Sequence, residues 1–371
     1  MKEEYELRGH TACNKEEGRK MKEEYDLRWR TKNFALRVIG LFGSLPKTAL
    51  AHIHRVSSFF LLPSSFLCLL LFTGCFSRPA AMNGPGYKRY TLAAEHIWQM
   101  NLPQGRRFDA SGLFLEKSGD LLTESDQQIG VYRIRFQPGG SSVDLERVPD
   151  CFTAAQLAPF AREKFGRYDC EGVTEDGQGR IYLCEEADRW ILRWDPRTKT
   201  VERLKIDWSP VKKYFSSDRN AAWEGIAIHG STLYVANERK KGRIIAVDLN
   251  TLKVTDSFAL PASHSLWYEP HYSDLCWFEG ALYALMREDH VILKIDPETH
   301  LALAEYNFAG MENDPHVAYY KVVPLVVGVM EGLAVDRHYF WLCTDNNGLA
   351  RKNYPGDTRP TLFQCRRPDA N

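Results

Sequence analysis

The stretch YDCEGVTEDGQGRIYLCEEADRWILRWDP, residues 168–196, carries the pattern that decides the fold. An acid followed by glycine opens a strand, a glycine-containing turn follows, a second strand ends in another acid, and a third ends in Asp-Pro. Further copies surround Glu224, Asp274 and Glu331, and a degenerate copy surrounds Ser111. The chain therefore repeats one strand-rich unit at intervals of 50 to 60 residues.

The two acids of each copy are 14 residues apart, and in the degenerate copy Ser111 and Ser125 have the same separation. A strand rises about 3.3 Å per residue, so a strand and its return bring the chain back to the end where it started. We therefore expect both acids of a copy at one rim of the fold. The four pairs are Glu171 and Glu185, Glu224 and Glu238, Asp274 and Glu288, and Glu331 and Asp345.

Composition indicates an all-β protein that needs no highly charged partner. The 371 residues include 48 basic and 48 acidic side chains, which gives no electrostatic reason to expect nucleic acid. Aromatic residues make up 12% and glycines number 26, as expected for short strands joined by tight turns. We expect a monomer.

The first 89 residues read as segments outside the globular domain. Residues 1–50 contain a near-duplicate octamer, MKEEYELR and MKEEYDLR, which indicates either a disordered tail or an upstream start that is not native. Residues 51–75 have an apolar core typical of a signal peptide. They end in Phe-Thr-Gly-Cys, which resembles the bacterial lipobox and would make Cys75 a lipid-bearing residue. Residues 76–89 would then be a tether, and 90–371 one domain.

This signal predicts a location in the cell envelope, lipid-anchored at the outer membrane or the periplasmic face, or secretion. An ordinary signal peptide or an uncleaved anchor is the alternative. Six of the nine cysteines lie beyond Cys75, which permits disulfides in an oxidising compartment. Cys170 and Cys184 are expected on adjacent strands and form the first candidate pair.

Each repeat holds three or four short strands, which is what one blade of a β-propeller requires. We predict a propeller of five blades, each of about four antiparallel strands, in which the strand near Tyr90 completes the last blade. Six blades are the alternative, if residues 90–102 and the C-terminal segment build another. A β-sandwich would give no reason for a repeated acid pair.

The repeated acids have two interpretations. Carboxylates gathered at one mouth repel one another, and hard oxygen ligands suit Ca²⁺, so the eight acids predict a metal site. Alternatively, one acid per blade accepts backbone hydrogen bonds and fixes the sheet, a role that would also repeat. Neighbouring basic residues would neutralise the acids or bind an anionic substrate, or be ordinary surface charges. They are Arg189, Arg239, Lys240 and Arg287.

Two histidines in the aromatic linker between repeats, His264 and His271, are candidate general bases. Surface histidines without a role are the simpler interpretation. The sequence has no G-x-S-x-G motif, P-loop or dinucleotide fingerprint, so it does not support those enzyme classes.

The units around Glu171 and Glu224 resemble the phytase-like, esterase-type propeller family and the related SdiA-regulated propeller proteins. The resemblance covers residues 108–355. It implies an envelope or secreted propeller that binds Ca²⁺ through the repeated acids and hydrolyses a phosphate or carboxylic ester. A non-catalytic propeller lipoprotein that binds a ligand or protein at the same mouth is the alternative.

Overall fold

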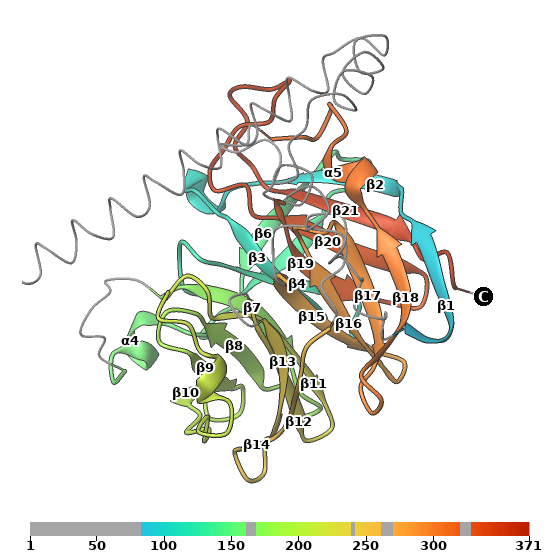
Figure 1. The fold of residues 1–371 in the computed structure, drawn as a ribbon. Coiled ribbons are helices and arrows are strands. Elements are labelled where there is room, and N and C mark those ends of the chain that lie inside the picture. Colours follow the sequence, from blue (N-terminus) through green and yellow to red (C-terminus); the bar gives the residue numbers. More distant parts are fainter. Residues whose placement is uncertain (1–82, 161–167, 239–241, 261–269, 320–327, 371) are drawn as a thin grey trace, which may run out of the picture. The chain divides into compact units, whose positions relative to one another are not determined.

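The computed structural model describes residues 83–160, 168–238, 242–260, 270–319 and 328–370 (Figure 1). The chain divides into two parts, Met1–Arg78 and Pro79–Asn371. The expected extension, signal segment and Cys75 lie outside the described residues. None of the helices in the described ranges has the length and apolar character needed to cross a membrane.

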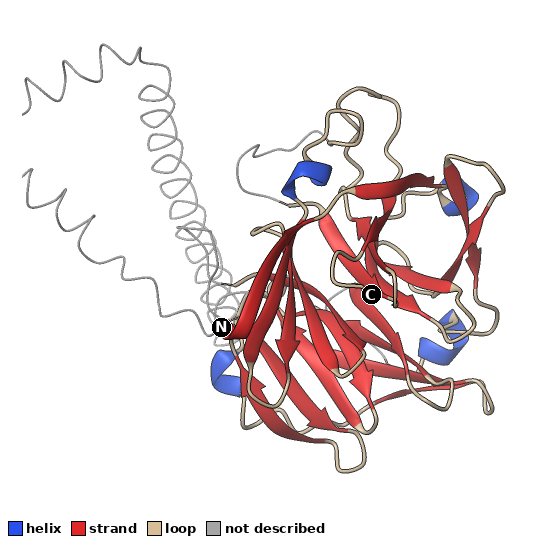
Figure 2. Ribbon diagram, turned by 90° about the vertical axis from the view of Figure 1, so that its right-hand side faces the viewer, coloured by secondary structure: helices blue, strands red, loops and turns tan. Residues whose placement is uncertain are grey.

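The fold is all-β, and the helices among the described residues are single turns in the connections between strands (Figure 2). The short helices are η1 (Pro103–Gly105), α4 (Ala154–Leu157), η2 (Lys212–Tyr214) and α5 (Ala309–Glu312). The strands form four-stranded antiparallel units, each named here by its first strand. The β3 unit contains β3 (Ala110–Leu115), β4 (Leu121–Ser125), β5 (Tyr132–Phe136) and β6 (Ser142–Arg147). The β7 unit contains β7 (Cys170–Glu175), β8 (Ile181–Glu185), β9 (Trp190–Asp195) and β10 (Thr200–Arg203).

The remaining strands repeat this plan. The β11 unit contains β11 (Trp223–His229), β12 (Thr232–Asn237), β13 (Arg243–Asp248) and β14 (Lys253–Phe258). The β15 unit contains β15 (Tyr272–Phe278), β16 (Ala281–Met286), β17 (Val291–Asp296) and β18 (Leu301–Asn307). The β19 unit contains β19 (Met330–Val335), β20 (Tyr339–Thr344), β21 (Thr361–Arg366) and, from the N-terminal side, β2 (Ala94–Met100).

Strands from the two ends of the domain complete one unit, as the sequence predicts. β2 pairs antiparallel with β21, so the last unit is closed by a strand that precedes all the repeats. A further strand, β1 (Asn83–Thr91), pairs in parallel with the edge strand β18. The strands therefore begin at residue 83, inside the segment 76–89 that the sequence indicates as a tether.

The described strands form four hydrogen-bonded sheets, whereas the sequence contains five repeats. The β19 and β3 units join into one eight-stranded sheet because β2 and β6 pair in parallel. That pairing consists of only two residue pairs, Gln99 with Ser142 and Met100 with Val143.

Each unit buries its faces against the next unit. Tyr182 and Ile191 of the β7 unit share one buried cluster with Trp223 and Val235 of the β11 unit. A single unit could not cover both its faces, so such packing must continue from unit to unit. The first strands β3, β7, β11, β15 and β19 contact one another in a closed series. This is the arrangement of a β-propeller and not of the two facing sheets of a sandwich.

Glycines let these first strands approach closely. A Cβ on Gly112 would lie 3.0 Å from the Cα of Gly172, and a Cβ on Gly172 would lie 3.0 Å from the Cα of Gly225. A Cβ on Gly332 would meet the backbone carbon of Gly112 at 2.9 Å. The glycine after the repeated acid is therefore required by packing between units.

The six cysteines beyond residue 150 all lie among the described residues, and no disulfide joins any two of them. Cys170 is paired in register with Glu185 and belongs to the cluster between the β3 and β7 units, whereas Cys184 belongs to the cluster on the other face. The proposed Cys170–Cys184 pair is therefore wrong, because neighbouring register positions face opposite sides of a sheet.

Candidate functional site

The first acid of a repeat occupies a β-bulge. In the β7 unit, Cys170 pairs with Glu185 and Gly172 pairs with Cys184, so Glu171 is the extra residue. Glu331 is the extra residue of the β19 unit in the same way, between Met330 and Gly332. A bulge turns one side chain out of the regular alternation, and bulges are frequent beside binding sites.

Asp274 does not share this position, because the β15 bulge falls at Ser273. Tyr272 pairs with Met286 and Asp274 pairs with Leu285. Asp274 therefore stands where the other units have their packing glycine. A Cβ on Gly225 would collide with its backbone.

The carboxylate of Asp274 ties three first strands together. It is fully buried, and its Oδ2 accepts hydrogen bonds from the backbone N–H of Leu333 at 2.7 Å and of Leu113 at 3.3 Å. Its Oδ1 accepts from Leu275 N–H at 2.8 Å. Burial raises the pKa of Asp274 and these three N–H groups lower it. This geometry is that of the backbone acceptor, the second interpretation of the repeated acids.

Acids that are 14 residues apart in the sequence do not occupy equivalent positions on the second strand of every unit. The residue before each bulge pairs with Glu185, Asn237, Met286 and Thr344 in turn. The residues that follow these partners are therefore structurally equivalent. They are Glu186, Glu238, Arg287 and Asp345. The carboxylate of Glu185 lies one residue earlier, is fully buried, and accepts the N–H of Asp188 at 2.9 Å.

One group of three carboxylates lies between the β7 and β11 units. One oxygen each of Glu186, Glu224 and Glu238 lie within 4.8 Å of one another, and all three side chains are buried. They come from the end of β8, the β11 bulge region and the end of β12. Glu186 also accepts the N–H of Ala222 at 3.1 Å through Oε1.

A second group lies between the β3 and β7 units. Asp126, Asp169 and Glu171 place one oxygen each within 4.8 Å of one another. Burial raises the pKa of Glu171 well above its usual value, and the negative charges of Glu224, Glu186, Asp126 and Asp169 raise it further. The charges of the first group therefore influence the titration of Glu171 in the second group. We call these six residues the acidic mouth: Asp126, Asp169, Glu171, Glu186, Glu224 and Glu238.

Arg287 borders the acidic mouth and carries a positive charge beside it. The Arg287 guanidinium makes ion pairs with Glu238 at 3.1 Å, with Glu288 at 3.6 Å and with Glu331. His271, which is buried, contacts Glu238, lies 3.4 Å from Glu288, and has its Nε2 3.0 Å from Arg287. Burial raises the pKa of Glu288, and Arg287 partly offsets this.

Asp345 lies near a further pair, Arg107 and Asp109, which are in ionic contact. Burial and then the charge of Asp109 raise the pKa of Asp345 to about 6, although the N–H of Asn347 and the charges of Arg287 and Arg107 lower it. Asp109 stands before the β3 strand and was not identified from the sequence. Its Oδ1 accepts the N–H of Gly348 at 3.1 Å.

Glu124 was also missed by sequence reasoning. It lies on β4, is fully buried, and neither of its carboxyl oxygens has a hydrogen-bond partner among the described residues. Burial raises its pKa well above the usual value, and the charges of Asp274 and Asp126 add to this. Its only sequence signal was its place two residues before Asp126 in the degenerate copy.

The other predicted residues divide into two sets. His264, Arg239 and Lys240 lie outside the described residues. Arg189 stacks over Phe215 at 4.9 Å and donates to the carbonyl oxygen of Ser216 at 2.9 Å. Burial lowers the pKa of Arg189, while Glu186 raises it.

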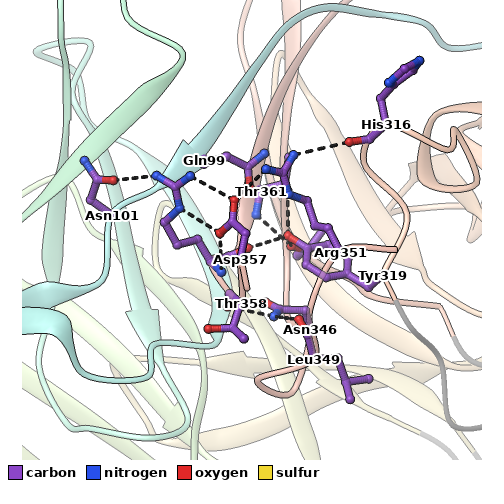
Figure 3. A network of polar contacts seen from close by, with 12 residues as sticks. Gln99, Asn101, His316, Tyr319, Asn346, Leu349, Arg351, Asp357, Thr358 and Thr361 are labelled. Atoms are coloured by element: carbon purple, nitrogen blue, oxygen red, sulfur yellow. Dashed lines mark hydrogen bonds and ion pairs between the residues drawn. The ribbon is translucent and has the colours of Figure 1, made fainter. Parts of the chain in front are cut away.

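A contrasting polar network lies on the β20–β21 connection (Figure 3). The carboxylate of Asp357 accepts from Arg351 at 2.6 Å and from two nitrogens of Arg359 at 2.8 and 2.9 Å. Arg359 also donates to Asn101 Oδ1 at 3.0 Å. Hydrogen bonds from Arg359 lower the pKa of Asp357 far below its usual value.

The acidic mouth fits a hard divalent cation. Each group of three supplies only carboxylate oxygens, the donors that Ca²⁺ prefers, and the mutual repulsion that raises the pKa of Glu171 would be relieved by a cation.

Comparison with known proteins gives one family match and several distant structural neighbours. No curated protein matches the sequence. Among solved structures, glutaminyl cyclase from Myxococcus xanthus is 13% identical, with 76% of this chain and 97% of that chain covered and a TM-score of 0.48. Aldose sugar dehydrogenase from Streptomyces coelicolor in its PQQ-bound form is 12% identical, with coverage of 74% and 98% and a TM-score of 0.41.

Virginiamycin B lyase from Staphylococcus aureus is 12% identical, with coverage of 72% and 73% and a TM-score of 0.37. The model of the phytase-like family, described as esterase-like activity of phytase, matches residues 109–348. That match covers most of the chain, from β3 to beyond β20. The protein therefore belongs to the phytase-like family.

Proposed function

We propose that this protein is a Ca²⁺-dependent hydrolase of phosphate or carboxylic esters that acts at the acidic mouth. The observation that carries the proposal is the meeting of three buried carboxylates, Glu186, Glu224 and Glu238, from three different strand ends. Carboxylate oxygens gathered in this way are the ligands that Ca²⁺ prefers, and a divalent cation would offset the repulsion between them. Membership of a family described by esterase-like activity supports the same conclusion.

The proposed architecture is a propeller of five blades. The eight-stranded sheet counts as two blades in this proposal because the β19 and β3 units share only two residue pairs. The six-blade alternative needs β2 and the C-terminal strand for an extra blade, but both already belong to the β19 unit.

Glu186, Glu224 and Glu238 would hold one Ca²⁺, and Asp126, Asp169 and Glu171 would hold a second. The bound cation would supply a positive field that polarises an ester or phosphoryl oxygen. Of the eight acids predicted from the sequence, Glu171, Glu224 and Glu238 stay in this ligand set. Asp274 and Glu185 serve as backbone acceptors in this proposal, and Glu288, Glu331 and Asp345 face Arg287 or Arg107.

Arg287 would orient the anionic part of the substrate at the edge of the acidic mouth. Its guanidinium is fixed by Glu238 and Glu331, so little side-chain entropy would be lost on binding. His271 contacts both Glu238 and Arg287 and would act as a positioning residue for them.

A second candidate function is a non-catalytic propeller that binds a small anionic ligand or a protein. The observation that favours it is the internal pairing of Arg287 with three acids, which already neutralises one side of the ring. In either case, we propose an envelope location through a lipid on Cys75, or secretion.

Hydrolysis of p-nitrophenyl phosphate and p-nitrophenyl acetate tests the proposal. We expect activity with CaCl₂, its loss with EDTA, and a decrease of at least about tenfold in Glu224→Gln. Glu298→Gln, which changes an exposed acid on the β17–β18 turn, is the matched control. Equal rates in wild type, Glu224→Gln and EDTA-treated protein would leave only the binding function.

A further inference from the structure

A pocket of about 430 Å³ lies at the strand ends of the β3 unit. Its walls come from the β2–β3 connection, the β4–β5 connection and strands β5 and β6. Ala110 pairs with Ser125, and Tyr132 pairs with Arg147, so these ends all lie on one side of the unit. Asp126 follows Ser125 directly. The pocket and the acidic mouth therefore lie at the same ends of the strands but are built from different residues.

The charge of this pocket is opposite to that of the acidic mouth. Arg106 and Arg147 both line it, and none of its lining residues is acidic. Among the described residues neither arginine is ion-paired with a carboxylate, and the Arg147 guanidinium donates to backbone carbonyl oxygens instead. Two guanidinium groups that share a cavity without a counter-charge favour an anion between them.

The pocket also offers a buried donor. Gln128 Nε2 is buried and has no hydrogen-bond partner among the described residues. An unsatisfied buried amide is unfavourable, so a ligand oxygen that accepts from this N–H would stabilise the folded protein.

Arg147 is held in place before any ligand binds. Its Nη2 donates to the carbonyl oxygens of Phe152 at 3.2 Å and Cys151 at 3.4 Å. Its Nε lies 2.9 Å from where a Cβ on Gly130 would be, so glycine is required for this approach. The backbone of Gly130 has φ of +144°, which a larger residue would adopt only with strain.

The remaining walls are apolar. Ile129 and Leu145 are half-buried, and the ring of Tyr132 is buried, so the cavity could hold a short hydrocarbon or aromatic body beside the charged head. Ligand sites combine an apolar lining with a few polar groups in this way.

We propose that this pocket binds a small organic oxyanion, with its carboxylate or phosphate head between Arg106 and Arg147 and its apolar body against Ile129, Leu145 and Tyr132. The site is independent of the proposed hydrolysis and of any metal at the acidic mouth. Gln128 donates the third hydrogen bond to the head.

Isothermal titration calorimetry with the full chain in EDTA tests this proposal, because EDTA removes any contribution from a cation at the acidic mouth. The probes are benzoate, phenyl phosphate, inorganic phosphate and the neutral analogue benzyl alcohol. We expect benzoate or phenyl phosphate to bind more tightly than both inorganic phosphate and benzyl alcohol. The better of the two aromatic anions identifies the head group.

Arg106→Gln should weaken binding of that anion about tenfold, the effect of losing one charge-assisted hydrogen bond. Arg106 is exposed, so this variant should retain the wild-type Tm. Gln128→Leu should weaken binding less, and Arg197→Gln, an exposed arginine on the β9–β10 turn, should not change it. Equal affinities for the aromatic anion in wild type and Arg106→Gln, equal binding of benzyl alcohol, or no heat at millimolar probe would overturn the proposal.

Discussion

The acidic mouth and the network around Asp357 lie at the same ends of their strands, yet the fold shifts the pKa values of their carboxyl groups in opposite directions. The carboxylate of Asp357 accepts hydrogen bonds from Arg351 and Arg359, and its pKa is lowered. Glu171 lies among four other acids, and its pKa is raised. The carboxylate of Asp357 is neutralised by adjacent arginines, whereas several acids gathered close together favour the binding of a cation from solution.

The largest expected difference between these regions is their response to pH. A carboxyl whose folded pKa is raised binds its proton more tightly in the folded state, so its contribution favours folding at low pH and is lost as pH rises through the folded pKa. Glu171 of the acidic mouth has such a raised pKa. Asp345 lies outside the mouth at the same strand ends, and for it the window extends from its unfolded value to about 6. In EDTA, stability should therefore fall by several degrees of Tm from pH 5 to pH 7.

Asp357 contributes to the pH dependence of stability with the opposite sign. Its pKa is lowered in the folded state, so its contribution favours folding above the unfolded pKa and is lost on acidification. Its effect is confined to strongly acidic solution. Urea unfolding at pH 5, 6 and 7 with and without CaCl₂ measures the difference. A stability in EDTA that rises from pH 5 to pH 7 would contradict this account of the acidic mouth.

Replacing a carboxyl group by the amide of the same shape should change the stability of the protein in opposite directions in the two regions. Asp357→Asn leaves Arg351 and Arg359 without their charge partner and should destabilise the protein by about 1–2 kcal/mol, a value reduced because the site is partly open to water. Glu171→Gln removes one of several repelling charges and should stabilise the EDTA-treated protein by about 1 kcal/mol. Thermal unfolding of both variants measures these changes. A loss of stability in Glu171→Gln would contradict the predicted difference between the two regions.

A smaller effect, on calcium affinity, tests which acid at the end of β8 faces the acidic mouth. Glu186 belongs to the acidic mouth, whereas Glu185 accepts a backbone N–H. Glu186→Gln should weaken Ca²⁺ binding about tenfold, which corresponds to about 1.4 kcal/mol. Glu185→Gln should change it less than about twofold. A larger effect for Glu185→Gln would restore the 14-residue spacing as the correct guide to the ligands.

The sequence predicted the repeated strands, the closure by a strand near the N-terminus and the gathering of acids at one end of the strands, since these follow from alternation, turn residues and strand length. It could not reveal the bulges, which move a side chain by one register position without a distinctive residue. Asp274 matched the spacing but occupies the glycine position of its strand. Glu124 gave no periodic signal because only its surroundings, the buried centre of the fold, make it unusual.

The most direct test of the central claim is a calcium titration of the EDTA-treated protein at pH 7, followed by calorimetry. We predict saturable binding that is weakened about tenfold in both Glu224→Gln and Glu186→Gln and is unchanged in Glu298→Gln. Absence of saturable binding, or equal binding in all four proteins, would contradict the assignment of the acidic mouth as a cation site.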